Sequence, residues 1–457
     1  MKGYWWFPDT PDKKLPGTLY YSPDDMHLEL IGSLTDITQF HKQFEHEIIL
    51  GFTTNGKPVT LYKCYTSNFS MSHPSIPTTS YRAIFYFVGM HFSKEEDIKF
   101  NQVSTHLIHF DEWMGISGFF SDVDDILANK VRILYSQPPA IKFELNEQFS
   151  ITIGFGYSVN SKLHDEKEQR ITQKIAINIE AKSEVSFFEF QKILSDIRQF
   201  LGLACLNPIY PLEVNGFTKS NEQTINNQTI QPQISIYFRQ MNMPSSVKEV
   251  NSMHMLFTYR DTSNDVGSYF KKWFDNKKIL EPIYNLYSDI LYNNETSLEH
   301  KFLSLTHALE AYHRRTSDET EIDEKSHEER LKEILTAIPP KYSDWLKDEL
   351  KFSNELSLRK RLDMLLKKVP FILEDPDSES KKFKNYILEV RNYLTHYSNK
   401  DKSPISDFRK LHETCERLKL LIEACLLFQL GFTDEKITLL IERSKINKGL
   451  KQGFQNA

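Results

Sequence analysis

The chain is poor in cysteine. Its 457 residues include only Cys64, Cys205, Cys415 and Cys425. No CxxC pair occurs, and no cysteine stands at zinc-ligand spacing from a histidine, so neither a disulfide framework nor a zinc site is expected. Cys415 and Cys425 fall about 15 Å apart on one predicted helix and cannot bridge each other. Such cysteine usage is typical of a reduced, intracellular protein.

The chain also lacks a long apolar run and an apolar segment near its N-terminus. Its most apolar stretch, residues 418–430, is interrupted by Lys419 and Glu423 and is too short to span a membrane. The formal net charge of −6 is mild and leaves room for a local basic groove. We therefore expect a cytoplasmic protein with no membrane partner.

Several catalytic signatures are absent as well. There is no glycine-rich phosphate loop, no HExxH motif and no convincing Ser/His/Asp order. The sequence offers no carboxylate-rich metal site. We expect no cofactor and no metal.

Residues 1–275 have the pattern of a β-rich region. Short alternating segments such as residues 26–32 predict strands, and Asn55-Gly56 between two β-like runs predicts a hairpin. Residues 186–203 carry apolar residues at helical spacing and predict one helix. Residues 161–170 and 221–233 are polar and predict loops.

The remaining 182 residues, 276–457, predict a helical bundle, so the expected fold class is α+β. The length indicates two or three domains, and a break at Gln137-Pro138-Pro139 predicts a subdivision of the β-rich region near residue 137. Thr296 and Glu299 fit a capping box at the start of one helix. About five helices are expected, over residues 297–314, 358–369, 381–397, 406–430 and 433–446.

The stretch RNYLTH (391–396) places an arginine, an asparagine and a histidine near the end of one of these helices. The apolar residues of the helix fall within about 60° of one another and predict its buried face. Asn392 and His396 are four residues apart and share a face almost opposite to it. Arg391 lies on the flank, about 140° from His396, with Leu388 between them. Such an outward face is either plain surface or a contact with a second copy.

These three side chains suit RNA cleavage. A histidine titrates near neutrality, so His396 can take a proton from a ribose 2′-hydroxyl or give one to the leaving oxygen. Arg391 can stabilise the developing charge on phosphate, and Asn392 can orient the histidine or the phosphate. The competing interpretation is a surface helix whose histidine meets the helix dipole.

A second helix adds polar residues to the pattern. Thr306, Glu310 and His313 form an i, i+4, i+7 stripe beside the apolar face of the helix at 297–314. A pairing of Glu310 with His396 or Arg391 would orient the site. In the alternative, Glu310 pairs only with His313 or Arg314.

The segment LEVRNYLTHYS resembles the Arg-x4–6-His signature of HEPN domains (higher eukaryotes and prokaryotes nucleotide-binding). Arg391, Asn392 and His396 match it, and Tyr397 follows as it often does in the family. Residues 301–315 resemble the early HEPN helix that carries a glutamate such as Glu310. The resemblance implies a dimeric ribonuclease with a composite, metal-independent site that leaves 2′,3′-cyclic phosphate ends.

The N-terminal region resembles that of ApeA proteins, which are HEPN-bearing bacterial anti-phage proteins. The matching segments are GTLYYSPDDMHLELIGSL (17–34) and ILGFTTNGKPVTLYKC (49–64). The resemblance implies abortive infection, in which RNA, with tRNA as one candidate, is cleaved after a phage-derived trigger. The β-rich region would then sense or restrain, with Trp5, Trp6 and residues 221–233 as candidate surfaces. The favoured alternative for the two tryptophans is that they are packed in the core of the lobe.

Two other functions remain open at this point. In one, the bundle is a non-catalytic sensor or scaffold that binds a nucleotide or a partner. In the other, a ligand-binding β lobe carries a dimerising helical tail. Arg391 and His396 lying far apart and buried would favour the last.

Overall fold

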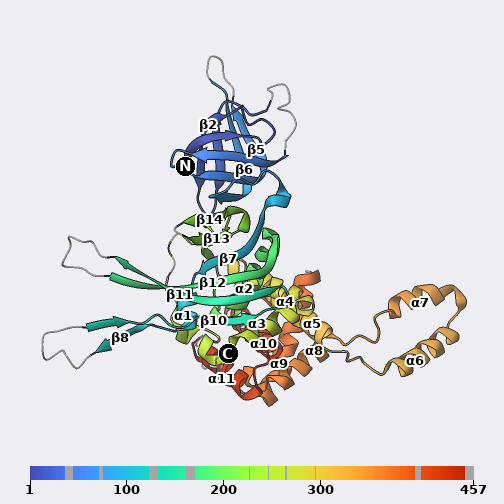
Figure 1. Ribbon diagram of the computed structural model, residues 1–457. Coiled ribbons are helices and arrows are strands. Elements are labelled where there is room, and N and C mark those ends of the chain that lie inside the picture. Colours follow the sequence, from blue (N-terminus) through green and yellow to red (C-terminus); the bar gives the residue numbers. More distant parts are fainter. Residues whose placement is uncertain are drawn as a thin grey trace. The chain divides into compact units, whose positions relative to one another are not determined.

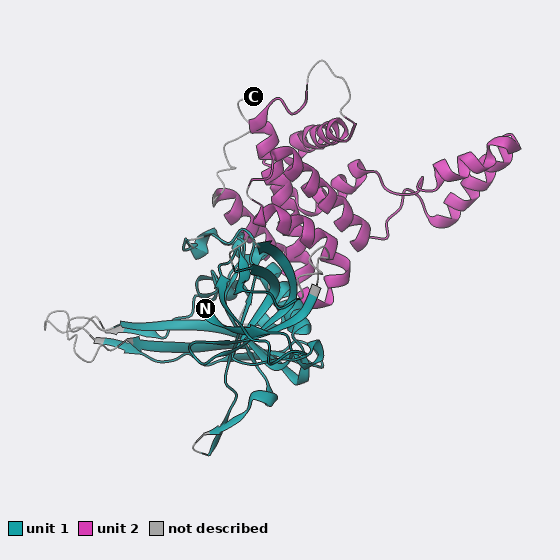
Figure 2. Cartoon of the chain, turned by 90° about the horizontal axis from the view of Figure 1, so that it is seen from above, with its two compact units in different colours: residues 1–271 teal, residues 272–457 magenta. Residues whose placement is uncertain are grey.

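The computed structural model divides into two compact units, Met1–Lys271 and Lys272–Ala457, called here the N-terminal and C-terminal units (Figure 2). None of the helices in the part of the chain that the structure describes is long and apolar enough to cross a membrane. The described residues are 1–35, 45–70, 76–122, 132–160, 170–225, 227–244, 246, 248–262, 265–293, 295–396 and 403–447.

Six antiparallel strands of the N-terminal unit close into a barrel (Figure 1). Their order is β6-β3-β2-β1-β4-β5, and β5 pairs again with β6 to complete the ring. Closure leaves no free edge among these strands. They are β1 (Lys2–Trp6), β2 (Leu15–Tyr21), β3 (Met26–Ile31), β4 (Glu45–Thr53), β5 (Pro58–Ser70) and β6 (Thr78–Val88).

The barrel interior is filled by alternate residues of its strands. Met26, Leu28 and Leu30 of β3 point inward, and Trp5 of β1 is fully buried among them. The Trp5 ring lies directly over Gly51, where a Cβ atom would come within 2.2 Å of the ring. Glycine is therefore needed at position 51 for Trp5 to fill the barrel.

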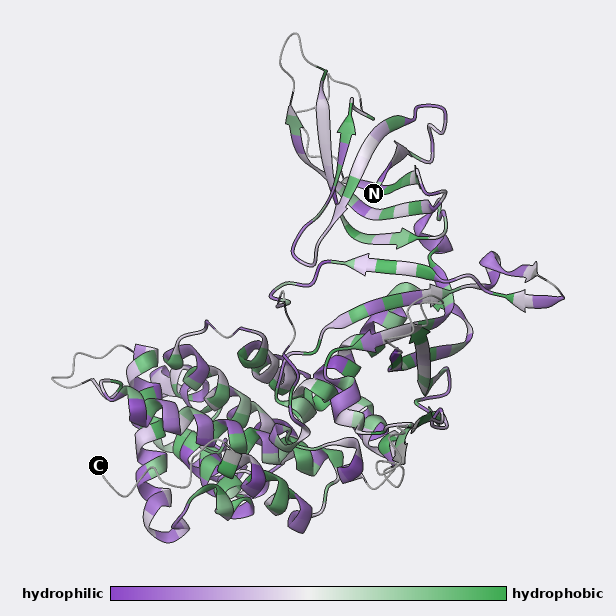
Figure 3. Ribbon diagram, turned by 90° about the vertical axis from the view of Figure 1, so that its left-hand side faces the viewer, coloured by the Kyte–Doolittle hydropathy of each residue, from purple (hydrophilic) through white to green (hydrophobic). Residues whose placement is uncertain are grey.

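The same sheet continues from β6 into six further strands, so that it has 12 strands in all. Figure 3 shows hydrophobic and hydrophilic residues alternating along many of its strands, as expected for a sheet with one buried face. Beyond β6 the order is β16-β13-β7-β12-β11-β10. These strands are β16 (Ile234–Phe238), β13 (Pro211–Phe217), β7 (Lys99–Leu107), β12 (Arg170–Ser186), β11 (Phe149–Asn160) and β10 (Ile141–Glu144).

Helix α2 (Phe187–Cys205) buries its apolar side in this second half of the unit. Its ring contacts include Phe187 with Phe100 and Phe190 with Phe149. Ser186 caps it by accepting from the Phe188 amide. The predicted helix at 186–203 is confirmed. The remaining elements of the unit are α1 (Phe110–Met114), the hairpins β8 (Phe119–Asp122)/β9 (Arg132–Tyr135) and β14 (Gln223–Ile225)/β15 (Gln228–Ile230), and α3 (Val266–Asp275), which runs across the division between units.

The hairpin predicted at Asn55-Gly56 is confirmed, since it joins β4 to β5 and Gly56 has a φ of +76°. One other prediction is wrong. Residues 221–233 contain the β14/β15 hairpin, in which each strand carries an adjacent Thr and Ile, residue types that favour strands. Trp5 and Trp6 are buried, which is the packing alternative and not the surface one. The predicted loop at 161–170 lies mostly outside the described residues.

The described part of the C-terminal unit is helical, so the α+β class is confirmed. Its core surrounds α10, which has buried residues on all sides and carries the apolar stretch at 418–430. The helices are α4 (Lys277–Tyr292), α5 (Leu298–Thr316), α6 (Glu324–Ala337), α7 (Ser343–Leu350), α8 (Leu358–Lys368), α9 (Pro376–His396), α10 (Phe408–Leu430) and α11 (Asp434–Asn447).

Three details of this unit differ from the sequence prediction. Helix α5 is capped by Ser297, which accepts from the His300 amide, and not by a box from Thr296 to Glu299. Helix α4 was not predicted, although its apolar residues recur at helical spacing. Helices α6 and α7 form an arm with no fully buried residue, and such weak burial leaves little periodic signal in the sequence.

Candidate functional site

The site is built on the last two turns of α9. Phe383, Ile387, Val390 and Leu394 are buried and fix this helix in the bundle, as the spacing predicts. The remaining face is therefore turned outward. Asn392 and His396 are both exposed there, and His396 is the last residue of the helix.

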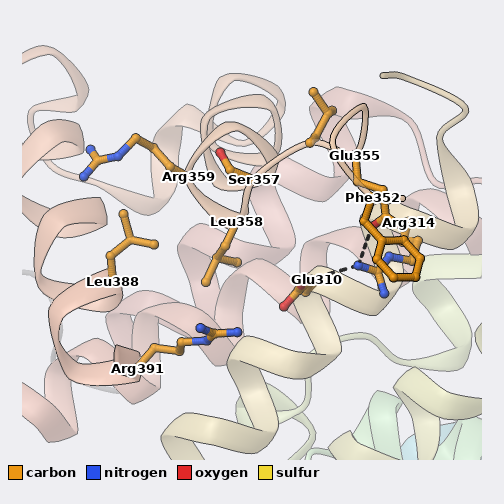
Figure 4. A pocket seen from close by; sticks show the side chains of 10 residues that line it. Glu310, Arg314, Phe352, Glu355, Ser357, Leu358, Arg359, Leu388 and Arg391 are labelled. Atoms are coloured by element: carbon orange, nitrogen blue, oxygen red, sulfur yellow. Dashed lines mark hydrogen bonds and ion pairs between the residues drawn. The ribbon is translucent and has the colours of Figure 1, made fainter. Parts of the chain in front are cut away.

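Arg391 lies between these two faces and lines a pocket of about 480 Å³ within the C-terminal unit. The pocket walls come from α5, from the start of α8 with the residues before it, and from α9 (Figure 4). Its lining carries three arginines and two glutamates, so cations and anions face one cavity. The lining residues are Glu310, Arg314, Phe352, Glu355, Leu356, Ser357, Leu358, Arg359, Leu388 and Arg391.

The Arg391 side chain is half-buried and only partly paired. One terminal nitrogen donates to Asn392 Oδ1 at 3.4 Å, a long and weak hydrogen bond. Its Nε is buried and has no hydrogen-bond partner among the described residues. Because a buried guanidinium N–H is costly to leave unpaired, this group is suited to receive an anionic oxygen.

Glu310 and Arg391 point toward each other across the pocket in Figure 4. The ion pair that Glu310 makes within the described residues is with Arg314, at 3.5 Å. Arg314 in turn contacts Glu355 at 2.8 Å. The alternative in which Glu310 pairs with Arg314 is thus the one observed, while Arg391 shares its cavity.

Thr306 and His313 lie in the interior of the bundle and not on its surface. The Thr306 hydroxyl donates to the carbonyl of Phe302, one turn earlier. His313 Nδ1 accepts from Arg361 at 3.3 Å. Burial first, and the Arg361 charge second, lower the pKa of His313 and favour its neutral form. Any supporting role of Thr306 and His313 would therefore act through packing. Tyr397, the remaining supporting residue expected from the sequence, lies outside the described residues.

Among the charged and aromatic residues of the pocket, Arg314 was expected only as a partner of Glu310, and Phe352, Glu355 and Arg359 were not expected at all. Phe352 and Glu355 stand between α7 and α8, while Arg314 and Arg359 are charged residues on helix surfaces. The one sequence signal for this part of the pocket is Ser357, a preferred N-cap residue, which caps α8 by accepting from the Lys360 amide. Within the described ranges, no group of three or more His, Cys, Asp or Glu side chains is placed to hold a metal ion.

Comparison with known proteins identifies both units. Residues 1–273 match the family model of ApeA N-terminal domain 1, and residues 303–436 match that of the Apea-like HEPN domain. No curated protein and no solved structure matches the chain. The N-terminal match spans 273 of 457 residues, more than half of the sequence. The chain therefore belongs to the ApeA family and is a HEPN-type anti-phage defence protein.

Proposed function

We propose that the C-terminal unit is a metal-independent endoribonuclease that acts in abortive infection. The observation that carries this proposal is the end of α9, where Asn392 and His396 are exposed. Arg391, on the flank, has a buried Nε that finds no hydrogen-bond partner in the described part of the chain. HEPN domains are generally associated with RNA cleavage, which agrees with this chemistry.

In this mechanism, His396 accepts the proton of a ribose 2′-hydroxyl, and the oxygen attacks the adjacent phosphorus. The bond from phosphorus to the 5′-oxygen breaks, and that oxygen takes a proton from an imidazolium. The products are a 2′,3′-cyclic phosphate and a 5′-hydroxyl. Arg391 stabilises the additional negative charge of the phosphorane, and Asn392 holds the imidazole or the phosphate.

The reaction uses one base and one acid, and each chain supplies one His396. A homodimer that brings two α9 ends together would provide both groups in one cleft. The outward position of Asn392 and His396 supports this arrangement, since a second copy could reach them. Arg391 on the flank is long enough to contact the same phosphate.

An enzyme that damages the RNA of its own host must be restrained until infection. We assign the restraint to the N-terminal unit, with a phage-derived molecule as the trigger and cellular RNA, including tRNA, as the substrate. The family match of this unit supports a defence context for the nuclease.

The test is cleavage of total cellular RNA by purified protein, with phage extract present and EDTA added. Wild type should produce fragments that end in cyclic phosphate, whereas Arg391→Ala and His396→Ala should not. Mixing wild type with an excess of His396→Ala should lower the activity per wild-type chain, if each site needs a His396 from two chains. Equal cleavage by His396→Ala and wild type would refute the mechanism.

A second function is favoured by the pocket itself. Phe352 and three arginines line a cavity of about 480 Å³, a composition suited to a nucleobase and its phosphates. If the unit only binds nucleotides, wild type should bind labelled ATP or GTP without cleaving RNA. Arg359→Ala should then weaken binding, and expression should not harm the host.

A further inference from the structure

Two neighbouring strands of the N-terminal unit separate before they end. The ladder between β13 and β16 consists of Asn215 with Ser235 and Gly216 with Ile234. On its other side β13 pairs with β7 as far as Pro211, and β16 pairs with β6 as far as Phe238. Within the described residues, 211–214 and 236–238 therefore lack a partner strand on the sides that face each other.

A cavity of about 320 Å³ occupies this separation. Its walls are residues 211–215 of β13 and 235–238 of β16, joined by Tyr21, Gln233 and Gln240. Buried strand edges are normally paired, because unpaired backbone groups away from water are costly. The two strands thus diverge within an otherwise continuous sheet, and the cavity, here called the gap, lies between them.

Gln240 spans the gap, also interacts with Tyr21 in the same cavity, and leaves one polar atom without a hydrogen-bond partner among the described residues. Its Nε2 donates to the carbonyl oxygen of Pro211 at 2.9 Å. Its Oε1 is buried and accepts no hydrogen bond from the described residues. An acceptor in this state would be satisfied by an N–H donor that enters the gap.

We propose that this gap is a binding site for an extended peptide segment of another protein. The segment adds a strand between β13 and β16, so that its backbone pairs with residues 211–214 and 236–238. An extended polypeptide is the ligand whose alternating N–H and C=O groups match two strand edges. The inference goes beyond the nuclease and stands whether or not the C-terminal unit cleaves RNA.

The charge at the rim specifies the peptide further. Glu213 lines the gap, and its side chain is 61% exposed. Its contact with Lys174, at 3.6 Å, joins two exposed groups and is weak enough to leave the carboxylate open to another cation. The bound segment therefore carries Lys or Arg at the position facing Glu213.

The probe is a displayed library of random peptides about ten residues long, selected on the full-length protein. Enriched peptides are synthesised with and without N-methyl groups on alternate residues. Ser235 lines the cavity where the ladder ends, so Ser235→Trp places an indole in the gap. Ser80→Trp is the matched control, since Ser80 is also half-buried between two paired strands but is not part of the cavity lining. Melting temperatures check that both variants fold.

Enriched peptides should contain Lys or Arg and bind wild type and Ser80→Trp equally. Filling the gap or N-methylating the peptide should weaken binding about tenfold, because each removes backbone hydrogen bonds. Glu213→Lys should also weaken binding, and this variant decides the matter if Ser235→Trp does not fold. Failure to enrich any peptide, or equal affinity of N-methylated and unmodified peptides, would overturn the proposal.

Discussion

Two histidine–arginine pairs lie in the C-terminal unit, and they differ in almost every physical respect. His313 and Arg361 are buried between α5 and α8, and Arg361 also donates to the carbonyl of Leu356 at 2.9 Å. Arg391 and His396 lie on the end of α9, where His396 is exposed and Arg391 is only half-buried. The first pair has its polar groups bound within the bundle, whereas the second presents them outward.

The difference shows why residue type alone does not identify a catalytic group. His313 is held neutral as an acceptor, and its removal would leave the Arg361 guanidinium short of a partner. His396 is exposed at the end of α9, so that a substrate can reach its imidazole. The first pair should therefore contribute to stability and the second to activity.

The largest expected effect is on catalysis at His396. His396→Ala should lower RNA cleavage by about 10²- to 10⁴-fold, since it removes the general acid and base. Its free energy of unfolding should stay within about 0.5 kcal/mol of wild type, because the side chain is exposed. His307→Ala, also at an exposed histidine, is the control and should keep full activity. A large loss of stability in His396→Ala would contradict the conclusion that His396 serves activity and not stability.

Arg391 should show the next largest effect. Arg391→Ala should reduce cleavage by about 10²- to 10³-fold through loss of phosphorane stabilisation. Arg391→Lys should recover only part of the activity, because an ammonium group cannot contact two phosphate oxygens in the same plane. Single-turnover rates at saturating RNA measure both. Full activity of the lysine variant would mean that charge alone matters at this position.

Substitution of Arg361 should have the opposite outcome. Arg361 is 4% exposed and contacts Leu356, His313 and, at 3.6 Å, Glu355. Arg361→Met should cost roughly 2–4 kcal/mol of unfolding free energy, because it leaves buried acceptors unpaired. Urea denaturation measures the loss, with Arg359→Met at an exposed position as the control. Equal stabilities of the two variants would contradict the structural role of Arg361.

The smallest effect concerns pH. Since folding lowers the pKa of His313, its contribution to stability is complete above the unfolded value of 6.5 and declines as pH falls below it. Burial and Arg361 lower this pKa, and Glu319 partly opposes them. His313→Gln should therefore lose less stability than wild type between pH 7.5 and 5. The melting temperatures of both proteins are measured across this range. An equal fall in wild type and His313→Gln would show that His313 titrates as it does in the unfolded chain.

Sequence reasoning succeeded where one element carries its own signal. The buried and outward faces of α9 follow from helical spacing, and the hairpin at Gly56 follows from local turn chemistry. It failed where the outcome depends on distant residues. The burial of His313 depends on Arg361 from another helix, and the pocket at Arg391 depends on Phe352 and Glu355, which α6 and α7 separate from α5 in sequence. Closure of the barrel is likewise a long-range property, since β6 must pair with β3 and β4 with β1.

The most direct test of the contrast is the chemistry of RNA ends in phage-infected cells that express wild type, His396→Ala or His313→Gln. We expect discrete fragments with 2′,3′-cyclic phosphate ends in wild type and His313→Gln, and intact RNA in His396→Ala expressed at an equal level. Cyclic-phosphate fragments of the same yield in His396→Ala would contradict it.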